Sequence, residues 1–194
     1  MQKALIISYF FPPCNLTAAN SLGTWEKYFP ENGIYPIVIT RNWTGKELTE
    51  AQRLANSGDK KRVVQQANSE IHYLPYHSSL RDLWFIKGKN NPVFAVLSKI
   101  ATLFYLIFQN FSLKFIPYNN LYFEARKLLI QDKTIKTLII SGNPFEQFYF
   151  GYLLKKEFPH IKWIADYRDD WTTTELIKNR SLLQKGIHFL EKRS

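Results

Sequence analysis

The chain has a single cysteine, Cys14, among its 194 residues. An internal disulfide is therefore excluded, and this cysteine usage is typical of a reducing compartment. The four histidines lack the spacing of a structural zinc site, and we expect no metal. The eight glycines are too dispersed for a dinucleotide-binding or P-loop fingerprint, which argues against a dehydrogenase or a kinase.

Acidic residues are in the minority, at 16 against 26 basic ones, which leaves a formal net charge of +10. This charge favours an anionic partner. Neither an aromatic RNA-binding motif nor a helix-turn-helix pattern accompanies it, so we expect no nucleic acid. The apolar run 4–11 is followed by Pro12-Pro13 without a convincing cleavage site, and it predicts a first strand rather than a signal peptide.

The apolar pattern predicts one α/β domain, with a Rossmann-like parallel sheet and helices on both faces. A βαβ unit opens the chain, with strands at 4–9 and 34–40 around a helix at 17–31. The middle and the end of the chain carry further expected elements: a long loop at 41–69 with a short helix near 48–56, a strand at 71–74, an irregular segment at 77–91, and helices at 119–131 and 181–193.

The strongest local pattern is a strand–helix–strand unit between Lys136 and Trp171. Its strands are expected at 137–141 and 161–167. Asn143 and Glu146 are expected to form a capping box at the start of the helix, with Pro144 at its first position. Parallel strands end at the same sheet edge, where ligands of open α/β sheets bind. We therefore expect 141–144 and 166–171 to form two walls of one cleft.

The most apolar segment, Pro92–Phe111, predicts a helix with one polar stripe: Ser98, Thr102, Tyr105 and Gln109. Its continuous apolar length falls short of the ~20 residues that span a bilayer. Two alternatives stay open, a central helix covered by the rest of the chain or a helix docked on a membrane face or a missing partner domain. In the second alternative, the basic residues near the helix in sequence would join the surface: Arg81, Lys87, Lys89 and Lys114.

Two stretches carry motifs in a characteristic order. The first, YFFPPCNLTAANSLGTWEKYFPENGIYPIVIT, has a Tyr-x-x-Pro-Pro-Cys turn between a strand and a helix. The second, LIISGNPFEQ…WIADYRDDW, has a Ser-Gly-x-Pro turn and an Asp-x-Arg-Asp-x-Trp strand end. Together they resemble bacterial family 4 glycosyltransferases, in particular the kind common in Bacteroidetes.

This resemblance implies a GT-B architecture, in which two Rossmann-like domains face each other across a cleft. It implies a retaining transfer of a sugar from a nucleotide-sugar to a saccharide or lipid-linked acceptor, with no metal or other cofactor. Residues 1–194 would be the single N-terminal, acceptor-side domain, because the Glu-x7-Glu pair of the donor-binding domain is absent from this chain. We expect the fragment alone to be inactive. Its expected setting is polysaccharide or lipopolysaccharide synthesis in the cytoplasm, peripheral to the inner face of the plasma membrane.

The same motifs select the candidate site residues. Asp166, Arg168 and Asp169 are the catalytic candidates, because carboxylates can orient sugar or acceptor hydroxyls and a guanidinium can stabilise a leaving phosphate. The structural alternative is a turn cap at Asp169 and a buried Asp166–Arg168 ion pair. The candidates for binding substrate or donor come from both motifs: Pro13, Asn15, Thr17, Ala18, Gly142, Asn143, Pro144 and Trp171.

Several of these residues have a second explanation. Members of the family that this chain resembles usually carry Gly-Gly and an arginine after Pro-Pro-Cys. This chain lacks both, so only the helix N-terminus at 17–19 would offer free N–H donors to a phosphate. Capping alone could explain Asn143 and Pro144, and Trp171 could pack in the core instead of stacking on a sugar. The alternative function for the whole chain is a non-catalytic, membrane- or partner-binding Rossmann-like module.

Overall fold

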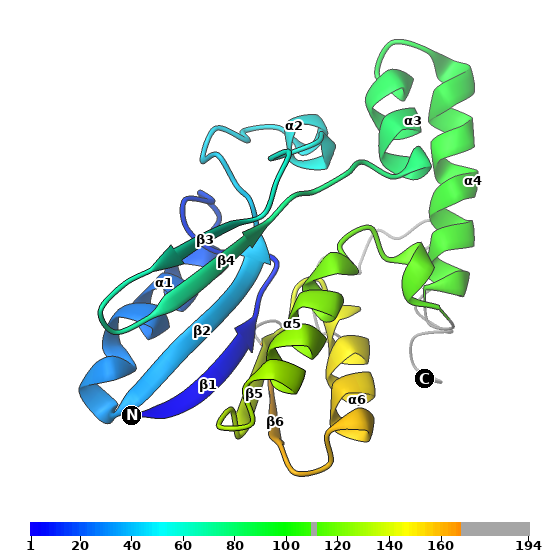
Figure 1. The fold of residues 1–194 in the computed structure, drawn as a ribbon. Helices are drawn as coiled ribbons and strands as arrows, with labels where there is room; N and C mark the ends of the chain where they lie inside the picture. Colours follow the sequence, from blue (N-terminus) through cyan, green and yellow to red (C-terminus); the bar gives the residue numbers. More distant parts are fainter. Residues whose placement is uncertain (110–111, 168–194) are drawn as a thin grey trace.

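The computed structural model describes residues 1–109 and 112–167. Its sheet has six strands in the order β3-β4-β2-β1-β5-β6, parallel throughout except for the β3–β4 pair (Figure 1). The strands are β1 (Gln2–Ile7), β2 (Ile34–Arg41), β3 (Arg62–Gln65), β4 (Glu70–Leu74), β5 (Thr137–Ser141) and β6 (Lys162–Asp166). The predicted α/β class is thus confirmed, and the sheet, predicted to be parallel, is mostly parallel and consistent with a Rossmann-like fold.

Helices cover both faces of the sheet, as predicted (Figure 1). Successive side chains of a strand point to opposite faces, so Leu5 and Ile7 pack with the helices at 120–131 and 147–157, whereas Ile6 packs with the helix at 17–28. The helical segments are α1 (Thr17–Tyr28), η1 (Pro30–Asn32), α2 (Glu50–Leu54), α3 (Leu80–Gly88), α4 (Pro92–Phe108), η2 (Leu113–Phe115), α5 (Asn120–Gln131) and α6 (Gln147–Glu157). The expected helix at 181–193 lies outside the described residues.

Two segments expected to lack regular structure contain it. The irregular segment predicted at 77–91 is wrong, because α3 lies within it. A capping box begins this helix: the Ser79 hydroxyl accepts from the Asp82 N–H at 3.2 Å, and the Asp82 carboxylate accepts from the Ser79 N–H at 2.8 Å. The loop predicted at 41–69 contains α2 as expected, but it also contains β3, which pairs antiparallel with β4.

α3 and α4 form a helical hairpin that projects away from the sheet (Figure 1). Gly88 lets the two helices approach closely, since a Cβ there would lie 2.9 Å from backbone atoms of Ala95. The polar stripe of α4 faces inward: Ser98 is only 7% exposed, and its carbonyl accepts from the Thr102 hydroxyl at 2.8 Å. The opposite, apolar side of α4 faces outward.

This arrangement bears on the two alternatives for α4. Phe104 is 45% exposed and Phe108 is 38% exposed, so residues 1–109 and 112–167 do not cover α4 as a central helix. The physical reason is that small residues such as Ser98 and Ala101 pack against α3, which leaves the large side chains on the other side. Among the residues that the structure describes, no helix combines the length and apolarity needed to cross a membrane.

A buried polar cluster connects β4 to α5. His72 on β4 is 3% exposed; its Nδ1 lies 3.0 Å from Oε1 of Glu124, and its Nε2 lies 2.5 Å from Oε1 of Glu70. The Lys61 ammonium donates to the same Glu124 oxygen at 2.5 Å. Burial acts to raise the pKa of Glu124, but the contacts with Lys61 and His72 outweigh it and hold that pKa below its ordinary value. The contacts with Lys61 and His72 therefore favour the charged form of the Glu124 carboxylate.

The Lys3–Asp132 ion pair leads to a prediction about pH. The ammonium donates to Oδ2 of Asp132 at 2.6 Å, and this bond, with that from Thr134, lowers the pKa of Asp132 from 3.8 to about 2. Because the pKa of Asp132 is lower in the folded protein than in the unfolded chain, the ionised carboxylate stabilises the fold at pH values above 3.8, the unfolded-state pKa. This stabilisation is lost as the pH falls toward 2. Because Lys3 is partly exposed, we expect Asp132→Asn to cost less than ~1 kcal/mol at neutral pH. Urea unfolding should show a smaller cost near pH 2, and an equal cost at both pH values would contradict this linkage.

Candidate functional site

The carboxyl edge of the sheet contains a topological switch point between β1 and β5. β2 and β4 follow on one side of β1, whereas β5 and β6 lie on its other side. Ligands of open α/β sheets bind in the crevice at such a point. The loop 8–16 follows β1 and the loop 142–146 follows β5, so the two sequence motifs lie at this edge together.

The ends of β5 and β6 form one continuous wall at this edge. Ser141 lies opposite Asp166 in the parallel register, and its hydroxyl donates to Oδ2 of Asp166 at 2.9 Å. The Gly142 N–H donates to the Asp166 carbonyl at 2.8 Å. Residues 141 and 142 thus lie against residue 166, as parallel pairing predicts, whereas the prediction that 141–144 and 166–171 form two walls of one cleft stays a prediction. The other calls on this segment, for Arg168, Asp169 and Trp171, lie outside the described residues and stay predictions.

The turn after β5 differs from the prediction. Asn143 has a φ of 71°, in the left-handed region, whereas an N-cap residue needs an extended backbone. The helix begins four residues later, at Gln147, with Glu146 before it and no side-chain cap. The predicted capping box of Asn143 and Glu146, with Pro144 as first helical residue, is therefore wrong. Positive φ at a residue other than glycine costs of order 1 kcal/mol and is enriched at functional sites, which leaves Asn143 a binding candidate.

An aromatic cluster lies against the same turn. A Cβ on Gly142 would lie 2.9 Å from Cζ of Phe148 and 3.2 Å from the Phe145 ring, so close approach of these rings requires glycine. The Tyr167 ring centroid is 4.4 Å from that of Phe148 and 6.3 Å from that of Phe145. Tyr167 is 60% exposed and directly follows Asp166 in sequence, so it presents an aromatic ring at the same end of β6. The sequence analysis missed this residue, although its place at the end of a strand was visible.

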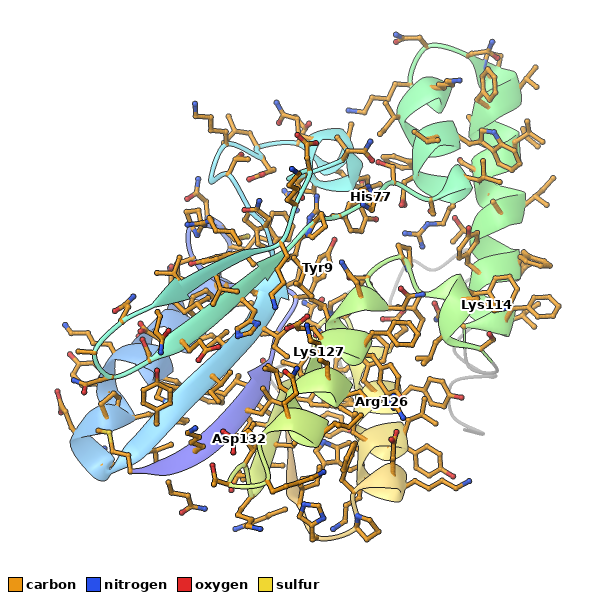
Figure 2. The ribbon with its side chains drawn as sticks, in the orientation of Figure 1. Tyr9, His77, Lys114, Arg126, Lys127 and Asp132 are labelled. Atoms are coloured by element: carbon orange, nitrogen blue, oxygen red, sulfur yellow. The ribbon has the colours of Figure 1, made fainter. Side chains whose placement is uncertain are left out.

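Glu146 lies at the switch point. Its Oε2 accepts from the Tyr118 hydroxyl at 3.1 Å, and its Oε1 accepts from Nε2 of Gln109 at 3.2 Å. The Tyr118 ring lies 4.8 Å from the ring of Tyr9. Tyr9 follows β1 and is labelled in Figure 2. Burial, together with the charge of Glu146, raises the pKa of Tyr118 well above its ordinary value, so the phenol remains protonated and donates. Glu146 is a carboxylate at the site that the sequence analysis had assigned to capping.

Arg41, at the end of β2, is buried at 1% exposure and binds internal groups. Its guanidinium stacks on Trp43 and Tyr76, with distances of 4.2 and 3.9 Å to the ring centroids. It donates hydrogen bonds to a set of buried or half-buried acceptors: the Tyr9 and Ser57 hydroxyls and the carbonyls of Arg53 and Ala55. These contacts order the loop 42–57, which lies beside the first motif. Because these hydrogen bonds are made within the protein, the guanidinium stabilises the fold and is not a candidate for ligand binding.

The first-motif residues lie over the end of β2. Pro13, Asn15 and Thr17 are exposed and Ala18 is half-buried. Nδ2 of Asn15 donates to the Gly45 carbonyl at 2.6 Å, which fixes this loop to the loop after β2. The Ala19 N–H donates to the Leu16 carbonyl at 2.9 Å, so the expectation of free donors at 17–19 is wrong at that position.

Cys14 belongs to the same motif but is inert. It is 5% exposed, and burial raises the pKa of its thiol. A protonated, buried thiol is a poor nucleophile. Nucleophilic catalysis by this cysteine is therefore not part of the candidate site.

Two further features bear on where the site lies. A hollow of about 460 Å³ lies at the opposite end of the sheet, lined by Met1, Glu26, Lys27, Pro30, Glu31, Gln66, Ala67, Asn68 and Ser69. Ligands of this class of fold bind at the carboxyl edge of the sheet, so the candidate site lies at that edge and not in the hollow. Within 1–109 and 112–167, no group of three or more His, Cys, Asp or Glu side chains is placed to hold a metal ion.

Comparison with known proteins gave no relative: no family model matches the chain, and neither the curated proteins nor the solved structures include a significant match. A function for the chain must therefore be argued from its motifs and from the geometry of the sheet edge.

Proposed function

We propose that the chain forms the acceptor-side, Rossmann-like half of a retaining glycosyltransferase with GT-B architecture. The observation that supports it best is the pairing of Ser141 with Asp166. This pairing brings the two parts of the second motif together beside the switch point, where the first motif also lies. The motifs resemble those of family 4 glycosyltransferases in residue type and order, and the sheet edge is where such a fold binds ligands.

The groups at this edge suit the chemistry of a sugar transfer. The bond between the anomeric carbon and the leaving phosphate breaks, the acceptor oxygen bonds to that carbon, and the proton of the acceptor hydroxyl passes to the leaving phosphate. The carboxylates of Asp166 and Glu146 can accept hydrogen bonds from sugar or acceptor hydroxyls, and the exposed Tyr167 ring offers an apolar face for a pyranose. Arg168 and Asp169, which directly follow, remain the predicted partners for the leaving phosphate and a reacting hydroxyl.

The rest of the reaction would be supplied by a second domain. In this proposal that domain holds most of the nucleotide-sugar, while exposed Pro13, Asn15 and Thr17 face it from the loop after β1. Asn143 and Pro144 line the other side of the switch point. The acceptor is a saccharide or a lipid-linked saccharide, no metal takes part, and the setting is the cytoplasmic side of the plasma membrane.

A non-catalytic binding module is the second candidate function, and the exposed apolar side of α4 favours it. The two functions differ in what must accompany this chain. A glycosyltransferase needs a donor-binding domain with a Glu-x7-Glu pair, either in a longer form of the same polypeptide or in a partner, whereas a binding module does not.

The proposal predicts that the 194-residue chain alone transfers no sugar and binds UDP- and GDP-sugars more weakly than micromolar. The reason is that the donor-binding half would supply most contacts to the nucleotide. Calorimetric titration with a panel of nucleotide-sugars measures the affinity, and incubation with membrane extracts measures transfer. Adding the donor-binding half should restore transfer. Sub-micromolar binding by the isolated chain would contradict the proposal that the donor-binding half supplies most contacts to the nucleotide.

A further inference from the structure

The outer face of α4 is an apolar surface that the described part of the chain leaves uncovered. It consists of Val93, Val96, Ile100, Leu103, Phe104, Ile107 and Phe108, with exposed fractions between 38% and 63%. At roughly 100° per residue these side chains span an arc of about 140°, which is wider than the seam of a coiled coil. The surface is therefore broad enough to lie on an extended partner rather than on a single helix.

Other helical segments pack against α4 and hold its outer face in place. α3 packs along the other side of α4, and the backbone contact of Gly88 with Ala95 brings the two helices close together. At the other end of α4, the rings of Phe104 and Phe108 each lie 5.4 Å from the Phe115 ring in η2. The exposed apolar side chains thus project from a packed hairpin and not from an isolated helix.

The exposed charges on the described residues of α3, α4 and η2 are all basic. The exposed basic residues near the outer face are Lys87 and Lys89 at the tip of the hairpin, Lys99 on α4 and Lys114 in η2. Figure 2 shows Lys114 beside the other end of α4. The sole acidic residue in the sequence between 80 and 114, Asp82, is fully buried and bonded to Arg81. The expectation that Arg81 would belong to this surface is wrong, because its guanidinium is held by Asp82 near the inward-facing Tyr105.

We propose that the outer face of α4 docks onto an anionic lipid bilayer. The helix has 17 residues, so it would lie flat over ~25 Å, with its apolar side chains at the level of the acyl chains. The lysines at both ends would then meet the anionic headgroups. A second copy of the chain fits this face less well, because an antiparallel pairing centred on Ile100 would bring the two Lys99 side chains together. This inference does not depend on the proposed sugar transfer.

Flotation of the full 194-residue chain with vesicles tests the inference. We expect binding to vesicles of phosphatidylcholine mixed with phosphatidylglycerol, weaker binding to phosphatidylcholine alone, and weaker binding at high salt. Each lysine near an anionic surface contributes about 1 kcal/mol, and ~1.4 kcal/mol is tenfold, so Lys87→Glu with Lys89→Glu should lower partitioning by at least about 20-fold. Ile100→Asn should lower binding to both kinds of vesicle.

Matched controls lie elsewhere on the molecule. Lys127→Glu with Lys156→Glu changes the same charge on exposed positions of α5 and α6, and Ile130→Asn removes a similarly exposed apolar side chain from α5. Both controls should bind vesicles about as well as the wild type. The inference is overturned if anionic vesicles bind no protein, if the hairpin variants bind as well as the controls, or if the chain forms a dimer that Ile100→Asn dissociates. None of these readouts involves a nucleotide-sugar, so they are separate from the test of sugar transfer.

Discussion

Replacing Arg41 by methionine is expected to lower the free energy of unfolding by about 3–5 kcal/mol. Methionine fills part of the volume but cannot donate. The carbonyls of Arg53 and Ala55 and the hydroxyls of Tyr9 and Ser57 would lose their donor inside the protein. Urea unfolding should show a lower midpoint with an unchanged slope, and the loop 42–57 should become sensitive to proteolysis.

Arg62→Met is the matched control. Arg62 also stacks on a tyrosine, with its guanidinium carbon 4.2 Å from the Tyr73 ring centroid, but it is exposed on β3. Its replacement should cost less than ~1 kcal/mol, because water can hydrate the groups that it leaves. Equal losses for the two arginines would show that stacking, and not the buried hydrogen bonds, makes Arg41 important.

Replacing Asp166 by asparagine in the enzyme completed by its donor-binding half is expected to lower turnover about a hundredfold. An amide keeps the size of the side chain but removes the negative charge that would hold a reacting hydroxyl. The Ser141 hydroxyl can still donate to the amide oxygen, so the melting temperature should change little. Steady-state rates per folded molecule and thermal unfolding of the same samples measure both effects.

Asp132→Asn provides the control for this substitution. Asp132 lies at the opposite end of the sheet from Tyr9 and the candidate site (Figure 2), so its replacement should leave turnover unchanged. If Asp166→Asn instead caused a large fall in melting temperature and left full activity per folded molecule, Asp166 would have a structural role only. In that case the bond between Ser141 and Asp166 would be its whole role.

The sequence predicted those parts of the fold whose patterns are formed by residues close to one another in the chain. The opening βαβ unit and the pair of strands at 137–141 and 161–167 show apolar runs bounded by turn residues, and the structure has strands there. Their common edge follows from parallel pairing, so the contact between Ser141 and Asp166 could be expected. β3 was missed because its four residues carry little apolar pattern, and only pairing with β4 makes them a strand.

The rest of the site depends on residues that are distant in sequence. The partners of Glu146, Tyr118 and Gln109, lie 28 and 37 residues before it, and no local pattern indicates that they meet. The capping box predicted for Asn143 was wrong for a similar reason, since packing of Phe145 and Phe148 against Gly142 sets the turn. For α4, periodicity identified which residues share a face. It could not identify which face α3 covers.

The antiparallel strand β3 has a consequence for how the protein behaves at high concentration. An edge strand presents unpaired N–H and C=O groups, which can pair with the edge of another molecule and start aggregation. Here the strand at that edge is only four residues long, and the basic run Lys60-Lys61-Arg62 leads into it. Short, charged edges are poor templates for a further strand. The strongly apolar strands β1, β2 and β5 are thereby kept in the interior of a sheet whose β3 edge resists growth.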